Sequence, residues 1–200
     1  MRRTVFLDMG NVLVWFSHER MCAQVASVFN CEPAAVHAVL FEDGLQQEFE
    51  SGRVTEADLR HKLESQLGSH ADPDHLRRAA SDIFEVNREI VPLLDELKRK
   101  GSRLILLSNT NVIHFEFIRS EFDILDWFDD FILSYEVGSL KPHPEIFRFA
   151  LQRAAVGAED CFFTDDILEN VEQARLLGIA AEVFTDSTTL EHQLRALNFI

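Results

Sequence analysis

Cysteine, positive charge and long apolar runs are all scarce in this chain. Only 3 of its 200 residues are cysteine (Cys22, Cys31 and Cys161), too few and too unevenly spaced for a disulfide framework or a cysteine-based zinc site. Lysine and arginine number 19 against 34 acidic residues, and the formal net charge of −15 disfavours nucleic acid and anionic membranes as partners. No apolar run has the length of a membrane span. The first apolar run is interrupted by Asp8 and Asn11, whereas the apolar region of a signal peptide is continuous. We therefore expect a cytoplasmic protein.

The content of hydrophobic residues (46%) and charged residues (26%) is ordinary for a globular protein. Five short apolar runs are typical of buried strands: TVFL (4–7), RLILL (103–107), DFIL (130–133), CFF (161–163) and AEVF (181–184). Helical patterns over 144–157 and 170–178 lie between the later runs. This alternation predicts an α/β fold, with a Rossmann-like, doubly wound parallel sheet flanked by helices.

A long segment interrupts this alternation after the first strand. Residues 16–88 contain only helical patterns, among them AQVASVF, PAAVHAVLF and TEADLRHKLESQL. Roughly seventy residues are too many for one crossover connection. We expect an inserted α-helical cap over 16–88 and a Rossmann-like core formed by 1–15 and 89–200.

Polar residues follow four of the predicted strands, and in a doubly wound sheet such strand ends meet at one crevice. In chain order they are Asp8 and Gly10, Ser108 and Asn109, Lys141, and Asp165 and Asp166. Taken singly, each has an ordinary explanation as a turn residue, a helix cap or a solvated charge. The four together, in this order, indicate a functional site.

Four segments that contain these residues carry a family resemblance: FLDMGNVLV, LLSNTN, GSLKPHPEIF and FFTDDILENVEQARLLG. Over nearly its whole length the chain resembles the haloacid dehalogenase-like hydrolase superfamily. Within it, the chain is similar to the helical-cap phosphatases of the sugar-1-phosphatase (α-D-glucose-1-phosphate phosphatase-like) group. The resemblance implies a Mg²⁺-dependent phosphatase that forms an aspartyl-phosphate intermediate. It also implies a small phosphorylated metabolite as substrate, expected to be a sugar phosphate, and a monomer or homodimer.

The resemblance implies a metal site as well. Asp8 would be both nucleophile and Mg²⁺ ligand, and the backbone carbonyl of Gly10 would be a second ligand. The acidic pair Asp165 and Asp166 would complete the site, with Asp166 favoured as the direct ligand by its spacing from the following helix. Hard oxygen ligands of this kind suit Mg²⁺.

The same resemblance assigns the phosphate-binding groups. Ser108 and the amide of Asn109 would donate hydrogen bonds to the phosphoryl oxygens. Lys141 would pair with the phosphate and hold Asp8 ionised, and so it would act in catalysis as well as in binding. A local cation is needed, because the whole chain is strongly acidic and would otherwise repel an anionic substrate.

The chain departs from the phosphatase pattern at Gly10. Many phosphatases of the superfamily carry a second aspartate at this position, two residues after the nucleophile, as general acid and base. Such proton transfer contributes roughly 10²–10⁴-fold to the rate. Either His18, a cap residue or water replaces it, or the leaving group needs little protonation. The DxGNV form is familiar in the sugar-1-phosphatase-like group, where an anomeric leaving group suits it.

Two further functions stay open beside the phosphatase. A metal-independent 2-haloacid dehalogenase shares the fold and the nucleophile, but its corresponding loop lacks a tight acidic pair, and adjacent carboxylates without a cation repel each other. A catalytically weak phosphate-binding module would also explain the glycine at position 10. The presence of Asp8, Ser108, Lys141 and Asp166 together favours the phosphatase.

Overall fold

A computed structural model describes residues 3–200 and contains one parallel sheet with the strand order β5-β4-β1-β6-β7. The strands are β1 (Thr4–Leu7), β4 (Arg103–Ser108), β5 (Asp130–Leu133), β6 (Cys161–Asp165) and β7 (Ala180–Val183). All neighbouring pairs in this sheet run parallel. The predicted α/β fold with a Rossmann-like sheet is confirmed, and each of the five predicted apolar runs coincides with a strand to within two residues.

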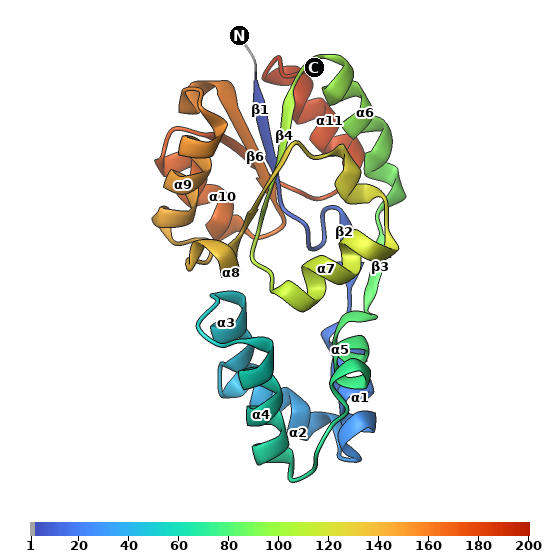
Figure 1. Cartoon of the computed structure of the whole chain (residues 1–200). Helices are drawn as coiled ribbons and strands as arrows, with labels where there is room; N and C mark the ends of the chain where they lie inside the picture. Colours follow the sequence, from blue (N-terminus) through green and yellow to red (C-terminus); the bar gives the residue numbers. More distant parts are fainter. Residues whose placement is uncertain (1–2) are drawn as a thin grey trace.

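Both faces of the sheet are covered by helices. Successive strand residues point to opposite faces, and in β1 the side chains of Val5 and Leu7 belong to one buried cluster while Phe6 belongs to another. Burial on both faces explains why the strands are continuous apolar runs instead of alternating ones. The covering helices are α6 (Val91–Arg99) and α11 (Ser187–Ala196) on one face, and α9 (Pro144–Ala154) and α10 (Leu168–Leu176) on the other (Figure 1).

A group of helices between residues 18 and 81 lies beyond the carboxyl ends of the strands, apart from the sheet (Figure 1). We call them the cap helices: α1 (His18–Phe29), α2 (Pro33–His37), the π-helical turn η1 (Ala38–Glu42), α3 (Leu45–Glu50), α4 (Glu56–Leu67) and α5 (Pro73–Ser81). Within the group, α1 packs against both α2 and α5. The division into a core of 1–15 and 89–200 and a cap of 16–88 stays a prediction.

A small antiparallel ribbon joins the cap helices to the sheet. Strand β2 (Val14–Phe16) pairs with β3 (Phe84–Val86), and Phe16 lies opposite Phe84. The expectation of purely helical structure over 16–88 was therefore wrong at this ribbon. Three residues are too few to show an alternating pattern, and the two strands pair only because the fold brings their distant segments together.

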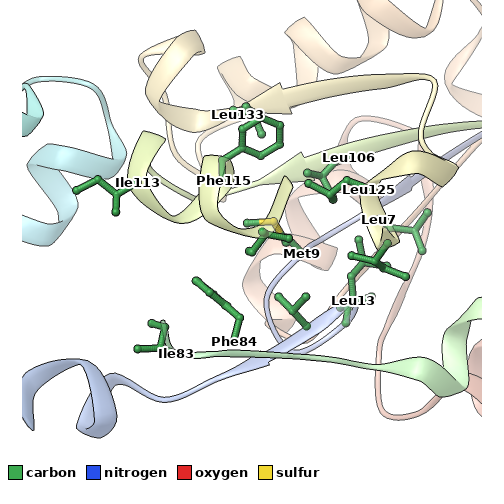
Figure 2. Packing of buried hydrophobic residues seen from close by; sticks show 14 of the residues in the cluster. Leu7, Met9, Leu13, Ile83, Phe84, Leu106, Ile113, Phe115, Leu125 and Leu133 are labelled. Carbon is green, nitrogen blue, oxygen red and sulfur yellow. The ribbon is translucent and has the colours of Figure 1, made fainter. Parts of the chain in front are cut away.

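The remaining helices lie near the end of the sheet that faces the cap, or connect its elements. They are α7 (Val112–Glu121), α8 (Ser134–Val137) and the short turns η2 (Arg88–Ile90), η3 (Ile124–Trp127) and η4 (Ala158–Asp160). Figure 2 shows part of one buried cluster, to which Leu7 and Leu106 in the sheet and Ile83 and Phe84 beside the cap all belong. None of the helices in the described part of the chain combines the length and apolarity that a membrane span requires.

Candidate active site

Asp8 directly follows β1, the central strand of the sheet. Its backbone N–H donates to the carbonyl oxygen of Thr164 on β6 (3.0 Å), which extends the pairing of the two strands by one residue. Strands β4 and β6 lie on either side of β1. The strands that follow β1 in the sequence are therefore added first on one side of it (β4, β5) and then on the other (β6, β7). This is the switch point beyond which doubly wound sheets bind their ligands.

Lys141 connects the ends of three strands through its ammonium group. Nζ donates to Asp8 Oδ1 (2.7 Å), to Asp165 Oδ2 (2.6 Å) and to the carbonyl oxygen of Leu107 (2.9 Å). These three bonds use all the protons of the ammonium group, and the side chain is only 1% exposed. Although burial lowers the pKa of Lys141, the carboxylates of Asp165 and Asp8 more than offset this and raise the pKa above its ordinary value. Lys141 is therefore a buried cation.

Asn109 holds the backbone of Lys141 in place. Its Oδ1 accepts a hydrogen bond from the Lys141 N–H (2.7 Å), and its Nδ2 donates to the Lys141 carbonyl oxygen (2.9 Å). Ser108, at the end of β4, is fully buried, and its hydroxyl donates to the carbonyl oxygen of Asn109 (3.3 Å). The structure thus brings both predicted phosphate-binding residues to the strand ends, and it uses the side chain of Asn109 to fix the loop that presents Lys141.

The predicted acidic pair lies beside Asp8. One carboxylate oxygen from each of Asp8, Asp165 and Asp166 lies within 4.8 Å of the others. Asp165 is fully buried, and besides Lys141 it accepts hydrogen bonds from Asn170 Nδ2 (3.0 Å to each oxygen) and from the Ile167 N–H (2.8 Å).

Asp166 has a more open environment than Asp165. It is partly exposed, and Asn11 Nδ2 donates to its Oδ2 (2.9 Å). Both carboxylate oxygens of Asp165 accept hydrogen bonds from Lys141 or Asn170, whereas Asp166 has more lone pairs that can bind another ligand. The assignment of Asp166 as the direct metal ligand stays a prediction.

Asp8 and Asp165 are both ion-paired with Lys141, and the third carboxylate, that of Asp166, lies beside them without an ion pair to this lysine. Burial raises the pKa of Asp8 to about 7 against the opposing attraction of Lys141, and the negative charge of Asp165 adds to the increase. An uncompensated negative charge on hard oxygen atoms is the environment that a divalent cation such as Mg²⁺ stabilises. The donor set therefore fits Mg²⁺.

Gly10 has no room for a side chain. A Cβ atom added at Gly10 would lie 2.8 Å from Cε1 of Phe16, closer than real Cβ contacts. The backbone turns back immediately after Gly10, and the Asn11 N–H donates to the carbonyl oxygen of Val14 (2.8 Å). The phenylalanine ring thus occupies the space into which a side chain at position 10 would project.

His18 lies at the start of α1 and contacts the same phenylalanine, Phe16. Its ring packs between Phe16 (4.9 Å between ring centroids) and Phe41 (4.7 Å). Burial, with a smaller effect of His37, lowers the pKa of His18 and favours the neutral imidazole, which can both accept and donate a proton. The role of His18 as a substitute for the missing aspartate stays a prediction.

Three polar residues that support the site were not assigned a role from the sequence: Asn11, Ser134 and Asn170. Ser134 Oγ accepts from the Thr110 N–H (3.0 Å) and donates to the carbonyl oxygen of Glu50 (2.6 Å), so it links the loop after β4 to the cap. Asn11 and Asn170 each bond one member of the acidic pair. Their short distance along the chain from Asp8 and Asp165 is the signal that identifies them as candidates.

A doubly wound sheet with a carboxylate after its central strand, a buried lysine and an acidic pair after β6 defines a class of α/β hydrolytic enzymes. The sequence pattern of one family in this class, described as haloacid dehalogenase-like hydrolase, matches residues 3–178. The chain belongs to this haloacid dehalogenase (HAD)-like hydrolase family and is an enzyme, and relatives of the chain are named phosphatases.

Curated relatives include two phosphatases. The chain is 29% identical to the sesquiterpene phosphatase astK of Aspergillus oryzae, over 76% of this chain and 78% of the relative. It is 26% identical to the D-ribitol-5-phosphate phosphatase of Bacteroides thetaiotaomicron, over 89% of each chain.

Solved structures of HAD-family enzymes have a similar fold. The HAD-family enzyme BT-2542 from Bacteroides thetaiotaomicron superimposes with a TM-score of 0.83 at 27% identity, covering 95% of this chain and 98% of that one. Its complex with magnesium and inorganic phosphate gives the same TM-score at 26% identity, covering 95% and 99%.

Proposed function

We propose that this protein is a Mg²⁺-dependent phosphatase that hydrolyses small phosphomonoesters, with Asp8 as the nucleophile. The observation that supports it most is the cluster of Asp8, Asp165 and Asp166, whose ligand atoms lie within 4.8 Å of one another beside the buried Lys141. Two similar enzymes are named phosphatases, and BT-2542 was solved with magnesium and phosphate bound.

The proposed reaction has two steps on Asp8. A carboxylate oxygen attacks phosphorus and the ester P–O bond breaks, so the leaving alcohol takes the electron pair and then a proton. Water next attacks the phosphorus of the aspartyl phosphate, which releases inorganic phosphate and restores the carboxylate. A Mg²⁺ ion held by Asp8, the Gly10 carbonyl and Asp166, with Asp165 beside it, would reduce the repulsion between the anionic nucleophile and the anionic ester.

The chain's own residues supply orientation and charge. Lys141 keeps the attacking carboxylate of Asp8 in one position and favours its ionised form. Ser108 and the backbone amide of Asn109, at the end of β4, would donate to the phosphoryl oxygens. Because Gly10 provides no proton donor, the leaving alcohol must obtain its proton from elsewhere.

A metal-independent 2-haloacid dehalogenase is the less favoured function. Enzymes so named occur among the structural neighbours, but at 16–17% identity they show the fold alone. Asp166 next to Asp165 would only add repulsion in a site that binds no cation. A binding module without activity would not need the buried ion pair of Lys141 with Asp8.

One assay separates these functions. Phosphate release from p-nitrophenyl phosphate is measured with Mg²⁺ and after chelation, alongside halide release from a 2-haloacid. The phosphatase requires phosphate release that depends on Mg²⁺. Halide release without metal would establish the dehalogenase, and phosphate binding without turnover would establish the binding module. Sugar phosphates, the substrates expected from the sequence, belong in the same panel, with sugar 1-phosphates among them.

A further inference from the structure

A cavity of about 340 Å³ lies between the cap helices and the first turn of α7. The proposed chemistry at Asp8 does not use it. Its volume is within the range of roughly 300–1,000 Å³ that is usual for small-molecule sites. In Figure 1 the helices α1, α3, α4 and α5 frame this region below α7. The walls are largely apolar and include the buried side chains of Met21, Leu40, Phe49, Leu63, Leu76 and Ile113.

The charged groups at the border of this cavity are already paired. Arg77 forms ion pairs with Glu56 and with Glu116, and so it joins α4 to α7 across the edge of the cavity. Arg60 pairs with Glu64 one turn further along α4 (3.2 Å). These arginines therefore do not provide an unpaired cation for a second anionic group inside the cavity.

The uncharged polar groups of the lining are engaged as well. The ring of His114 forms hydrogen bonds with Asn111 Nδ2 (3.1 Å) and with the Ala80 carbonyl oxygen (3.1 Å). Gln46 Nε2 donates to Glu50 Oε1 (2.8 Å). A sugar placed here would lose the hydrogen bonds of its hydroxyl groups to water and gain few in return, whereas an apolar chain loses nothing.

The cavity is close enough to the phosphate site for one molecule to occupy both. Asn111 borders the cavity and follows Ser108 by three residues, a separation of at most about 11 Å even in an extended chain. Ser134 fixes the relative position of the two sites, because its Oγ accepts a hydrogen bond from the Thr110 N–H (3.0 Å) and donates its one proton to the Glu50 carbonyl oxygen (2.6 Å).

We infer that the substrate of this enzyme is a phosphomonoester whose alcohol carries an apolar chain, and that this chain occupies the cavity between the cap helices and α7. The phosphate then lies at Asp8, Ser108 and Lys141. The inference rests on the proposed phosphatase function and specifies its substrate. It replaces the sugar phosphate expected from the sequence by an ester with an aliphatic tail.

A series of para-alkylphenyl phosphates tests this inference, because the phenol leaving group is nearly constant while the tail grows from methyl to octyl. We expect kcat/KM to rise by about threefold for each added methylene until the cavity is full, as expected from the transfer of methylene groups out of water. Binding of para-octylphenol, which has no phosphate, is measured by calorimetry as a readout that does not depend on catalysis.

A pair of variants on α1 locates the tail. Val25 lines the cavity, and Val25→Phe fills part of it, whereas Val28 lies on the same helix outside the lining. Val25→Phe should lower kcat/KM for the octyl ester by about tenfold or more and leave the methyl ester within about twofold, and Val28→Phe should change neither selectively. Thermal unfolding of both variants shows that they are folded.

The possible outcomes separate the inference from the function on which it rests. Turnover of the methyl ester with no gain from longer tails, and no binding of octylphenol, would overturn the apolar substrate and keep the phosphatase. Octylphenol binding that Val25→Phe removes, without turnover of any ester, would overturn the phosphatase and keep the apolar ligand site. Faster turnover of sugar phosphates than of the octyl ester would also overturn the inference.

Discussion

The ammonium group of Lys141 lies 2.6 Å from Oδ2 of Asp165, and both side chains are almost completely buried, at 1% and 0% exposure. Asp165 therefore holds Lys141 next to Asp8 and is itself fixed by Asn170. A buried ion pair of this kind is costly to break, because the remaining partner becomes an unpaired charge in a poorly solvated environment. The acidic pair thus has two different environments: Asp165 within the buried network and Asp166 at its open edge.

Replacing the buried cation should destabilise the fold and abolish activity. In Lys141→Met the carboxylates of Asp8 and Asp165 lose their shared partner, and we expect a loss of about 3–5 kcal/mol in the free energy of unfolding near pH 8. Without Lys141 the pKa of Asp8 rises further above its ordinary value. Its protonated form is then favoured in the fold, so the loss should be smaller near about pH 5. Urea unfolding with chelator present at both pH values measures this, and an equal loss at both would contradict the role of charge.

Removal of the Asp166 carboxylate should mainly weaken Mg²⁺ binding, whereas removal of the Asp165 carboxylate should mainly destabilise the fold. For Asp166→Ala we expect the Mg²⁺ concentration that gives half-maximal activity to rise by about tenfold or more, with partial recovery at high Mg²⁺, because a direct ligand is lost. The melting temperature should change little. Asp165→Ala should instead lower the melting temperature, since Lys141 loses its buried partner. Calorimetric Mg²⁺ titration compares the two variants, and weaker binding in Asp165→Ala than in Asp166→Ala would reverse the assignment.

Asp8→Asn should remove turnover and leave the fold intact. The amide cannot attack phosphorus, so kcat should fall by about a thousandfold or more. Burial raises the pKa of Asp8 to about 7, so the ionised carboxylate is unfavourable in the metal-free fold above that pH. The melting temperature of metal-free Asp8→Asn should therefore equal or exceed that of the wild type near about pH 8.

The matched control for this variant is Asp126→Asn, the same change at an exposed position in η3, which should keep full activity. The enzyme assay uses mass-verified protein, so that deamidation of the new asparagine is excluded. Substantial Mg²⁺-dependent turnover by intact Asp8→Asn would falsify the assignment of the nucleophile.

The sheet could be predicted from the sequence because its strands are buried on both faces. The central strands contain runs of apolar residues such as RLILL and CFF, and the helix before β7 is followed by Gly178, as its sequence predicted, whereas α9 ends at Ala154, three residues before the expected Gly157. The ribbon of β2 and β3 could not be predicted. Its pairing of Phe16 with Phe84 depends on a contact between segments far apart in the chain, and no local pattern of three residues encodes it.

The site residues could be identified for a related reason. Parallel strands place their following residues at one edge of the sheet, and the structure brings Asp8 and Asp165 together there, both bonded to Lys141. What the sequence does not contain is side-chain packing: that Asn109 holds the Lys141 loop, that Phe16 fills the space at Gly10, and that the cap helices leave a cavity.

His114 should make stability depend on pH. The ring is buried, and burial lowers its pKa from 6.5 to about 4, so the unfolded chain binds a proton between these values and the folded chain does not. The contribution of the neutral His114 ring to the free energy of unfolding is fully present above about pH 6.5. As the pH falls toward about 4, the free energy of unfolding decreases by an amount on the order of 3 kcal/mol because of this group.

His114→Gln tests this, because a glutamine can still donate to the Ala80 carbonyl oxygen but does not titrate. Urea unfolding at several pH values should show a shallower decline below about pH 6.5 in the variant than in the wild type. Parallel curves for the two proteins would show that other groups cause the acid sensitivity.

The last prediction concerns the missing general acid. Gly10→Asp alone should destabilise the protein by about 1–3 kcal/mol, because its Cβ would meet the ring of Phe16, and it should gain no activity. Removing the ring in Gly10→Asp/Phe16→Ala opens that space. The effects of the two substitutions on the free energy of unfolding should therefore be strongly non-additive. The double variant should then accelerate esters of poorly acidic alcohols by about tenfold or more, and p-nitrophenyl phosphate much less, because only the former need a proton in the transition state.

The measurement is kcat/KM over a series of unbranched aryl and benzyl phosphates whose leaving groups differ in pKa, with Phe16→Ala as the matched control. A steep dependence on leaving-group pKa in the wild type and in Phe16→Ala, flattened in the double variant, is the expected result. A flat dependence already in the wild type would show that another group donates the proton. His18, whose ring packs on Phe16, is then the residue to replace, and His18→Gln should make the dependence steep.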